Sequence, residues 1–383
     1  MSLNTWQEIL DGSKPPLLGC GCMRFPLERI HHKLDSDRAR QLVDMSMKLG
    51  ISYYDTAWPY HGGENEPVLG EILSAYPREN YFLVTKLPCW EIESLDQARQ
   101  TLERQLQRLR TDYLDGYLLH SLSRKTWDRM KRLGVPELLE EYRANGVLRH
   151  VGFSFHDRYE VFEEILCSRP WDLCQIQLNY MDTTYQAGLR GLELARARGV
   201  PVVIMEPLKG GLLAQLPAEV AQPLRAIDPQ ASDASWALRW IASQPGVRVV
   251  LSGMAEEGQL QENHRLFEPL RPLDQRELDA VEEAADRLRQ RLKNGCTGCR
   301  YCLPCPQGVD IPRTFQIWNS MAMYDNQKLT RRAWRGLEEE ARPNHCVGCG
   351  HCETLCPQQI SISRDLAQAE RDVEAFVQRK NDL

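Results

Sequence analysis

The stretch ISYYDTAWPY, residues 51–60, begins as an apolar run and ends in polar residues. Similar short β-like runs occur between about residues 17 and 270, and amphipathic helical stretches alternate with them. Several of the runs are continuously apolar, which is typical of strands that are buried on both faces. The eight runs are LGCG at 18–21, ISYYDTA at 51–57, YFLVTKLP at 81–88, YLDGYLLHSL at 113–122, RHVGFSFH at 149–156, LCQIQLNYM at 173–181, PVVIMEPL at 201–208 and VRVVLSGM at 247–254.

Eight β–α units in one block of this length favour a closed (β/α)₈ TIM barrel, which is an α/β fold. An open, doubly wound sheet is the alternative that the same pattern allows. The stretch from Asp274 to Lys293 has the pattern of a charged amphipathic helix, which we expect to close the barrel. A cysteine-rich region begins at Asn294 and Gly295. We therefore predict a barrel domain over residues 1–290 and a second domain over residues 291–383.

The composition is that of an ordinary globular protein, with 42% hydrophobic and 26% charged residues among 383. The net charge of -6 gives no electrostatic reason to expect nucleic acid or an anionic membrane as a partner. The sequence has no apolar run long enough to span a membrane, and its first residues lack a secretion signal pattern. We expect a cytoplasmic protein.

Eight of the 13 cysteines lie in two tight groups near the C-terminus. A disulfide framework would suit a short secreted chain, so metal or cluster ligation is the better interpretation. The second group has the spacing with which bacterial ferredoxins hold [4Fe–4S] clusters, and the first is one residue shorter before its last cysteine. The groups are Cys296, Cys299, Cys302 and Cys305, followed by Pro306, and Cys346, Cys349, Cys352 and Cys356, followed by Pro357.

Two motifs of this kind predict two [4Fe–4S] clusters, because three closely spaced thiolates wrap one cluster while the fourth reaches the neighbouring one. Cys356 would then serve the cluster held by Cys296, Cys299 and Cys302. A zinc site is the alternative, since four-cysteine zinc sites also use paired C-x₂-C units. The segments IWNSMAMY and LTRRAWRGLEEEA between the two groups have helical patterns. We therefore expect a small, mostly helical, ferredoxin-like domain.

Four polar residues stand at or just beyond the ends of predicted strands, where barrels of this type carry their chemistry: Asp55, Tyr60, Lys86 and His120. Taken singly, each has an ordinary structural interpretation, such as a helix cap for Asp55 or a packing residue for Tyr60. Taken together, DTAWPY at 55–60, VTK at 84–86 and YLLH at 117–120 resemble the catalytic tetrad of the aldo-keto reductase family. The resemblance covers the chain from Leu18 to Asn263.

This resemblance implies an oxidoreductase that interconverts a small carbonyl and an alcohol by hydride transfer. Tyr60 would be the general acid, Asp55 and Lys86 would tune it, and His120 would hold the carbonyl. Hydride addition leaves negative charge on the oxygen, which needs a proton donor. A free tyrosine has a pKa of about 10, and a nearby Lys86 would lower that pKa. Asp55 would keep the lysine charged.

The resemblance also implies a nicotinamide site, with Ser154 and Gln175 at the carboxamide. Phe155 and His156 follow Ser154 where the family has asparagine, and Met205 replaces a tyrosine that stacks on the ring in many members. Methionine can still cover a flat ring, but with less specific geometry. A flavin in place of nicotinamide is therefore an alternative.

The segment SGMAEEGQLQEN at 252–263 resembles the family's last cofactor-binding segment, but Gln259 stands where the family has a basic residue. Glu256 and Glu257 would repel a 2′-phosphate, which needs arginine or lysine, so we expect NAD(H) rather than NADP(H). The predicted cofactor contacts are Gly21, Met23, Arg24, Ser154, Gln175, Met205, Pro207, Leu208, Gly210, Gly253, Gln259, Glu262 and Asn263.

Three functions fit these observations. The first is a barrel reductase with an attached iron–sulfur electron-transfer module and a redox partner protein. The second is a flavin-dependent barrel oxidoreductase that exchanges electrons with the clusters. The third is a non-catalytic electron carrier or redox sensor whose barrel is a scaffold. The complete set of four site residues favours an enzyme.

Overall fold

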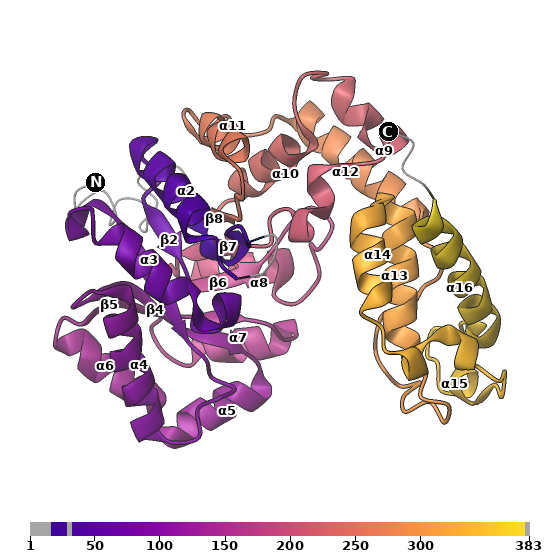
Figure 1. The fold of residues 1–383 in the computed structure, drawn as a ribbon, viewed down its shortest axis with the longest axis horizontal. Coiled ribbons are helices and arrows are strands. Elements are labelled where there is room, and N and C mark those ends of the chain that lie inside the picture. The colour runs from indigo at the N-terminus through magenta and orange to yellow at the C-terminus, as the bar shows by residue number, and fades with distance from the viewer. Residues whose placement is uncertain (1–16, 29–32, 380–383) are drawn as a thin grey trace. The chain divides into compact units, whose positions relative to one another are not determined.

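The computed structural model describes residues 17–28 and 33–379, which form two compact units (Figure 1). The first unit comprises the described residues of Met1–Gly210 together with Ala234–Gln275. The second comprises Gly211–Asp233 and the described residues of Arg276–Leu383. The first 16 residues of the predicted barrel domain lie outside the described part of the chain.

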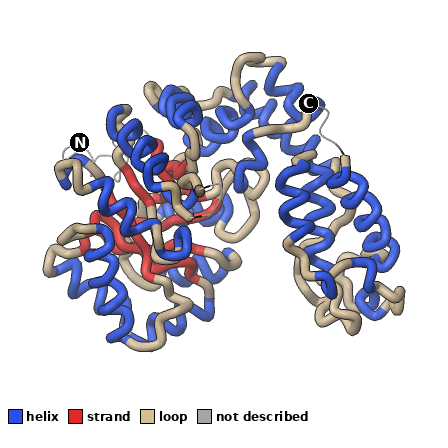
Figure 2. Tube along the Cα trace, in the orientation of Figure 1, coloured by secondary structure: helices blue, strands red, loops and turns tan. Residues whose placement is uncertain are grey.

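The first unit contains a closed barrel of eight parallel strands that pair in chain order, with β8 returning to β1 (Figure 2). The predicted barrel is thus confirmed, and all eight predicted strands are present. Each is equal in length to the predicted run or within a few residues of it. The strands are β1 (Leu17–Gly21), β2 (Tyr53–Asp55), β3 (Phe82–Leu87), β4 (Leu114–Leu122), β5 (Leu148–Phe155), β6 (Leu173–Gln177), β7 (Val202–Met205) and β8 (Val247–Ser252).

Side chains from several strands form one buried cluster in the barrel. Tyr53 and Phe82 stack with ring centroids 5.1 Å apart, and leucine and valine side chains of β3, β4, β6, β7 and β8 complete the cluster. Full burial of such a side chain stabilises the fold by roughly 1.5–3 kcal/mol relative to exposure. The barrel interior is therefore a packed core, and the polar groups at its rim are held on a rigid base.

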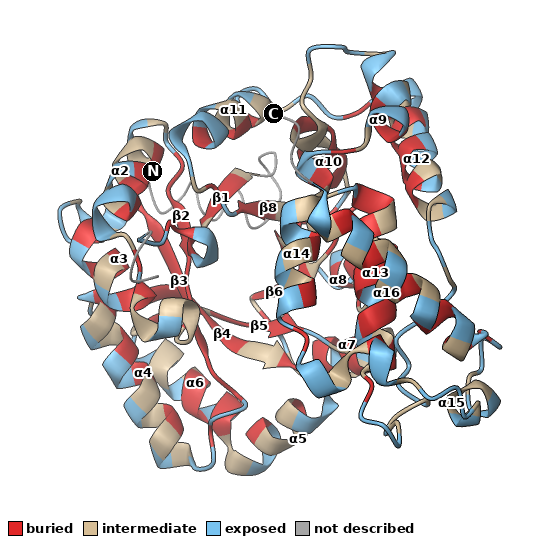
Figure 3. Cartoon of the chain, turned by 45° about the vertical axis from the view of Figure 1, so that its right-hand side comes forward, coloured by how far each residue is buried: buried red, intermediate tan, exposed pale blue. Residues whose placement is uncertain are grey.

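Helices surround the barrel, and Figure 3 shows their buried residues on the sides that face the strands. In the first unit they are α2 (Ser36–Lys48), α3 (Asn65–Leu73), α4 (Leu95–Leu109), α5 (Arg124–Leu133), α6 (Val135–Ala144), α7 (Tyr159–Cys167), α8 (Gly188–Ala197), α10 (Asp233–Ala242) and α11 (Glu257–Phe267).

The start of α4 shows how the local sequence sets a helix end. The Ser94 hydroxyl accepts a hydrogen bond from the backbone N–H of Gln97, which satisfies one free donor of the first turn. A full capping box would also place the Gln97 side chain on the N–H of Ser94. Instead, that side chain accepts from the N–H of Glu93, one residue earlier. The cap forms, but with a different second contact.

The second unit is helical, as predicted. Its helices are α9 (Ala218–Arg225), α12 (Gln275–Gln290), α13 (Ile311–Tyr324), α14 (Gln327–Arg335), α15 (His351–Thr354) and α16 (Ile362–Gln378). Phe315 and Trp318 of α13, Trp334 of α14, and Leu366 and Val373 of α16 belong to its buried core. Several of the motif cysteines pack against this core.

The helix α12 groups with the second unit, and the expectation that it closes a barrel domain ending at residue 290 stays a prediction. Two arginines at its C-terminal end make contacts within the second unit. Arg287 donates to the carbonyl of Glu219 near the start of α9, and Arg291 donates to the carbonyl of Ala322 on α13.

Among the described residues, none of the helices is long and apolar enough to cross a membrane.

Candidate active site and cluster motifs

The buried ion pair of Lys86 and Asp55 is the centre of the predicted tetrad. Lys86 lies on β3 and Asp55 at the end of β2, and these neighbouring strands bring the ammonium Nζ to 2.6 Å from a carboxylate oxygen. Lys86 also donates to the carbonyl of Thr56, at 2.8 Å. Burial lowers the pKa of Lys86, but Asp55 and Tyr60 outweigh it, so the pKa is raised and the lysine stays charged.

Tyr60 lies just beyond β2, in the short 3₁₀ segment Tyr60–Gly63, and its hydroxyl is 3.4 Å from Lys86 Nζ. Burial raises the pKa of the phenol, and Lys86 acts in the opposite direction. The net direction is upward. We expected Lys86 to bring this pKa below its ordinary value, but the burial of the ring has the larger effect.

His120 of β4 lies beside Tyr60, with ring centroids 6.2 Å apart, and beside Trp90, at 5.0 Å. Burial lowers the pKa of His120 to about 2, and the positive charge of Lys86 adds to the effect. The imidazole is therefore neutral. Its Nδ1 atom has no hydrogen-bond partner among the described residues. The structure thus brings all four predicted residues together at the C-terminal ends of β2, β3 and β4.

Behind Lys86 lies a polar network that the sequence interpretation missed. The buried Glu66 of α3 accepts hydrogen bonds from Thr85, at 2.7 Å, and from Gln105 of α4, at 2.6 Å. Gln105 also donates to the carbonyl of Lys86, at 3.1 Å. The sequence contained a signal for the burial of Glu66, because this residue falls on the same face of α3 as the buried Leu69 and Leu73.

Two of the predicted cofactor residues face each other across neighbouring strands. Ser154 of β5 is paired in register with Gln175 of β6, and both are buried. The Ser154 hydroxyl accepts from the N–H of Ser121, at 2.7 Å. The Gln175 side-chain oxygen is buried without a hydrogen-bond partner among the described residues. An unpaired buried acceptor of this kind fits the amide N–H of a carboxamide.

The predicted residues Gly21, Met23 and Arg24 follow or end β1, and Arg24 crosses over Gly253 after β8. A Cβ atom on Gly253 would lie 2.4 Å from the Arg24 side chain, so this approach requires glycine. The Arg24 guanidinium lies 3.9 Å from Glu206, which follows β7. These contacts join the ends of β1, β7 and β8.

Met205 is the last residue of β7, Pro207 and Leu208 follow the strand, and Gly210 lies in the 3₁₀ segment Lys209–Ala214. Lys209 is held by Asp182, with contacts of 2.6 and 2.7 Å. The same carboxylate accepts from the side chains of Gln177 and Asn179. Asp182 thereby ties the loops after β6 and β7 together.

In the predicted cofactor-binding segment 252–263, Gln259 is exposed and its side-chain oxygen accepts from the N–H of Ala255, at 2.9 Å. Glu262 is partly buried on α11, and Asn263 donates to the Ser252 hydroxyl, at 3.1 Å. The sequence interpretation missed Arg38 of α2, which donates to the carbonyl of Ala255, at 3.4 Å. No local pattern links residues so far apart in the chain.

In the second unit the motif cysteines line two cavities, and each cavity combines the two sequence groups. Cys296, Cys299 and Cys302 line one of them together with Cys356. Cys346, Cys349 and Cys352 line the other together with Cys305, and Cys302 also borders this second cavity. The last cysteine of each group thus reaches across to the other group.

Fold and site together define a (β/α)₈-barrel protein with a buried Lys–Asp pair, a tyrosine and a neutral histidine at the barrel rim, joined to a cysteine-lined helical unit. A model of the aldo/keto reductase family matches residues 17–286, and a 4Fe-4S dicluster domain matches residues 295–360. The chain belongs to the aldo/keto reductase family and carries a 4Fe-4S dicluster domain at its C-terminal end.

Several proteins that are similar to this chain are named as oxidoreductases. L-galactose dehydrogenase of Arabidopsis thaliana is 27% identical over 304 residues, which cover 73% of this chain and 93% of that protein. NADH-specific methylglyoxal reductase of Escherichia coli is 26% identical over 264 residues, which cover 56% of this chain and 78% of that protein. Among solved structures, the holo form of aldo-keto reductase AKR11C1 from Bacillus halodurans is 26% identical with a TM-score of 0.59, covering 70% of this chain and 91% of that chain.

Proposed function

We propose that the barrel interconverts a small carbonyl compound and the corresponding alcohol, with Tyr60 as the proton donor. The observation that carries this proposal is the contact of 3.4 Å between the Tyr60 hydroxyl and Lys86 Nζ, beside the buried pair with Asp55. The oxygen that gains negative charge during reduction would lie between the Tyr60 hydroxyl and the His120 ring. Tyr60 would transfer its proton there, and Lys86 would stabilise the phenolate left behind.

A nicotinamide coenzyme would supply the hydride when bound. Gln175, with its unpaired buried oxygen, and Ser154 would hold its carboxamide. Arg24, whose side chain packs over Gly253, would supply a positive charge for its phosphates. We propose NAD(H) as the preferred coenzyme, because Gln259 supplies no positive charge and Glu256 and Glu257 are exposed beside it.

The test of this proposal is carbonyl-dependent oxidation of NADH by the purified protein. Two relatives carry the names of their substrates. Methylglyoxal is therefore the first compound to try for reduction, and L-galactose the first to try for oxidation. Tyr60→Phe should lower turnover by about 10²-fold or more, because it removes the proton and leaves the ring. Tyr142→Phe, which alters a tyrosine on the outer helix α6, is the matched control and should retain turnover. Equal turnover of Tyr60→Phe and wild type would exclude Tyr60 as the acid.

For the second unit we propose that the two cavities hold two [4Fe–4S] clusters that exchange electrons with a partner protein. Cys296, Cys299, Cys302 and Cys356 would ligate one cluster, and Cys346, Cys349, Cys352 and Cys305 the other. Cys299 and Cys349 are exposed, so each cluster would have a side that a partner can approach.

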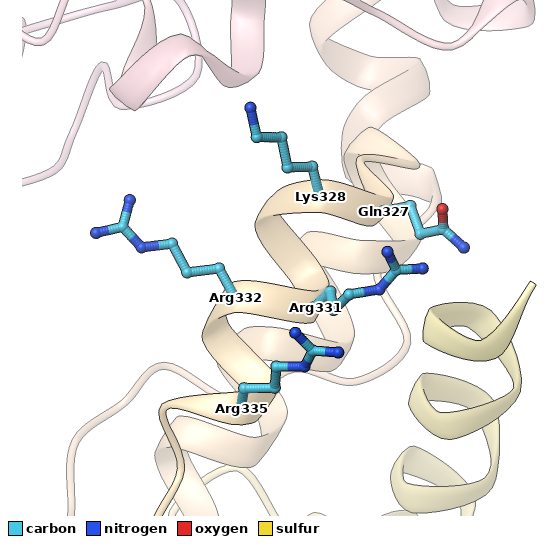
Figure 4. Close-up of a pocket in the computed structure, with 5 residues that line it drawn as sticks. All are labelled: Gln327, Lys328, Arg331, Arg332 and Arg335. Atoms are coloured by element: carbon cyan, nitrogen blue, oxygen red, sulfur yellow. The ribbon is translucent and has the colours of Figure 1, made fainter. Parts of the chain in front are cut away.

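The charge of α14 supports an acidic partner. Lys328 and Arg332, one turn apart, project from the same side of the helix, whereas Arg331 points toward α16, where it donates to the carbonyl of Val377 (Figure 4). Lys328, Arg332 and Arg335 are exposed, and their side chains make no hydrogen bond or ion pair with any described residue. Unpaired positive side chains of this kind speed the association of oppositely charged proteins.

A further inference from the structure

The turn that follows Tyr60 has an unusual backbone. His61 has φ 54 and ψ 40, and Gly62 has φ 64 and ψ 22, so both lie in the left-handed region. Glycine adopts this conformation freely, but a residue with a Cβ atom pays roughly 1–2 kcal/mol there. The side chain of His61 must therefore make contacts that hold the turn in place.

Both ring nitrogens of His61 are engaged. Nε2 lies 3.1 Å from the carbonyl oxygen of Phe25, and Nδ1 lies 3.0 Å from the side-chain nitrogen of Asn65. A carbonyl only accepts and an amide nitrogen only donates. Only the neutral tautomer that carries its proton on Nε2 satisfies both contacts.

Asn65, at the start of α3, is fully buried and its amide orientation is fixed by two further bonds. Its nitrogen also donates to the carbonyl of Cys22, at 3.0 Å, and its oxygen accepts from the Thr56 hydroxyl, at 2.6 Å. The backbone carbonyl of Thr56 accepts from Lys86, at 2.8 Å. A continuous set of contacts therefore runs from His61 through Asn65 and Thr56 to Lys86.

We propose that His61 is a positioning residue, which fixes the turn behind Tyr60 and so keeps the phenol hydroxyl within reach of Lys86. Tyr60 is bonded through its backbone to His61, at one end of this set of contacts. Its hydroxyl contacts Lys86, at the other end. Loss of the His61 contacts frees the turn while leaving all four residues of the tetrad in the chain. This inference rests on the proposed role of Tyr60 in carbonyl reduction.

Protonation of His61 breaks the network at one atom. A proton on Nδ1 removes the acceptor for Asn65 and sets two N–H groups against each other. Burial lowers the pKa of His61 below its ordinary 6.5, while the bond to Phe25 and the charge of Glu64, on the same turn, act in the opposite direction. The neutral ring is thus present above 6.5 and is lost as the pH falls through the lower pKa of the folded protein.

Two variants separate the contacts of His61 from its backbone conformation. His61→Gly suits the left-handed backbone but removes both bonds, whereas His61→Asn tolerates that backbone and keeps an acceptor near the position of Nδ1. We expect His61→Gly to lower kcat at least about tenfold with little change in KM, because the proton donor is misplaced. His61→Asn should retain most of kcat at pH 8 and should lose the fall of kcat that His61 causes in acid.

The ¹³Cζ resonance of Tyr60, assigned by its absence in Tyr60→Phe, provides a readout that does not need turnover. We expect it to move in His61→Gly and to return toward its wild-type position in His61→Asn. An unchanged resonance together with wild-type kcat and pH profile in His61→Gly would overturn the inference. Full turnover in Tyr60→Phe would instead refute the proposed function, while the resonance would still report whether His61 positions the ring.

Discussion

Lys86 acts on the two rings beside it in complementary ways. Its charge favours the phenolate of Tyr60, and it disfavours the imidazolium of His120. Because the pKa of His120 is about 2, this ring has no acidic proton to give at neutral pH. It can still orient a carbonyl. Burial raises the pKa of Tyr60, so this phenol remains protonated through the neutral range and is the proposed acid of the pair.

Under the proposed function, we expect selection between NAD(H) and NADP(H) to depend on single residues at the start of α11. We expect the wild-type protein to bind NADH more tightly than NADPH. Gln259→Lys should tighten NADPH at least about threefold and leave NADH unchanged, because the new ammonium meets only the 2′-phosphate. Direct titration by fluorescence measures both affinities. Gln261→Lys on the same exposed helix is the control. Tighter NADPH binding by the wild type would contradict this expectation and would direct attention to Arg38.

At the scale of the element, the strands and their order could be predicted because several are continuous apolar runs and all eight alternate with helical stretches, as a closed barrel requires. The meeting of Asp55, Tyr60, Lys86 and His120 could be predicted for the same reason, since a strand end has a defined position on the rim, whereas their catalytic roles stay a prediction from the family resemblance. The contacts of Glu66 with Gln105 and of His61 with Asn65 could not. They join side chains from different elements, and their partners depend on how the helices pack.

The placement of α12 has the same origin. Its charged, amphipathic pattern predicts a helix but does not specify which core its apolar face covers. Arg287 on α12 contacts α9 and Arg291, just after the helix, contacts α13, and neither contact has a local signature in the sequence. The cysteine motifs are the opposite case, because their spacing alone predicted the crossing seen in the two cavities.

The close packing of α3 on α4 gives a prediction at this scale. A Cβ atom on Gly70 would lie 2.4 Å from the carbonyl oxygen of Arg108 and 2.6 Å from Cα of Leu109, so the helices must move apart. We expect Gly70→Ala to lower the free energy of unfolding by about 1–3 kcal/mol. Gly258 of α11 is the matched control, because nothing lies within 4 Å of its added Cβ.

Gly258→Ala should raise the free energy of unfolding by about 0.5–1 kcal/mol, since alanine is the better helix former. Urea unfolding, followed by the circular dichroism of the helices, measures both variants. Equal stability of Gly70→Ala and wild type would show that α3 and α4 do not depend on this close approach.

At the scale of the whole molecule, the metal content tests the crossing of the cysteine groups. We expect roughly eight iron and eight sulfide per chain after anaerobic purification. Cys356→Ser should lose iron from the cluster of Cys296, Cys299 and Cys302. Cys167→Ser, which alters an exposed cysteine outside the motifs, should keep the full content. Loss confined to the cluster of Cys346, Cys349 and Cys352 would contradict the crossing.

The proposed nicotinamide coenzyme and the iron–sulfur clusters transfer different numbers of electrons in each step. A nicotinamide transfers two electrons together as hydride, whereas each cluster takes one at a time. We therefore expect NADH alone to leave the clusters oxidised, as followed by electron paramagnetic resonance under anaerobic conditions. A reduced, acidic flavodoxin should reduce them, more slowly at high salt.

The charge-reversing double variant Lys328→Glu, Arg332→Glu should slow the reaction with flavodoxin. Arg371→Glu on α16, which changes the total charge in the same direction, is the control. Rapid and complete reduction by NADH without flavin or substrate would show that the two-electron limit does not hold here. Equal rates in the double variant and the wild type would remove α14 as the docking surface.

The crossing of Cys305 and Cys356 has a consequence for how the second unit is assembled. Each cavity is closed by a cysteine from the other end of the domain, and α13 and α14 lie in the chain between the two groups. A metal group in either cavity would bridge the two ends of this segment and restrict the unfolded chain, as a covalent cross-link does. The first group to be inserted would therefore bring together the thiols for the second. Loading should be all-or-none, with few molecules carrying a single cluster when iron is limiting.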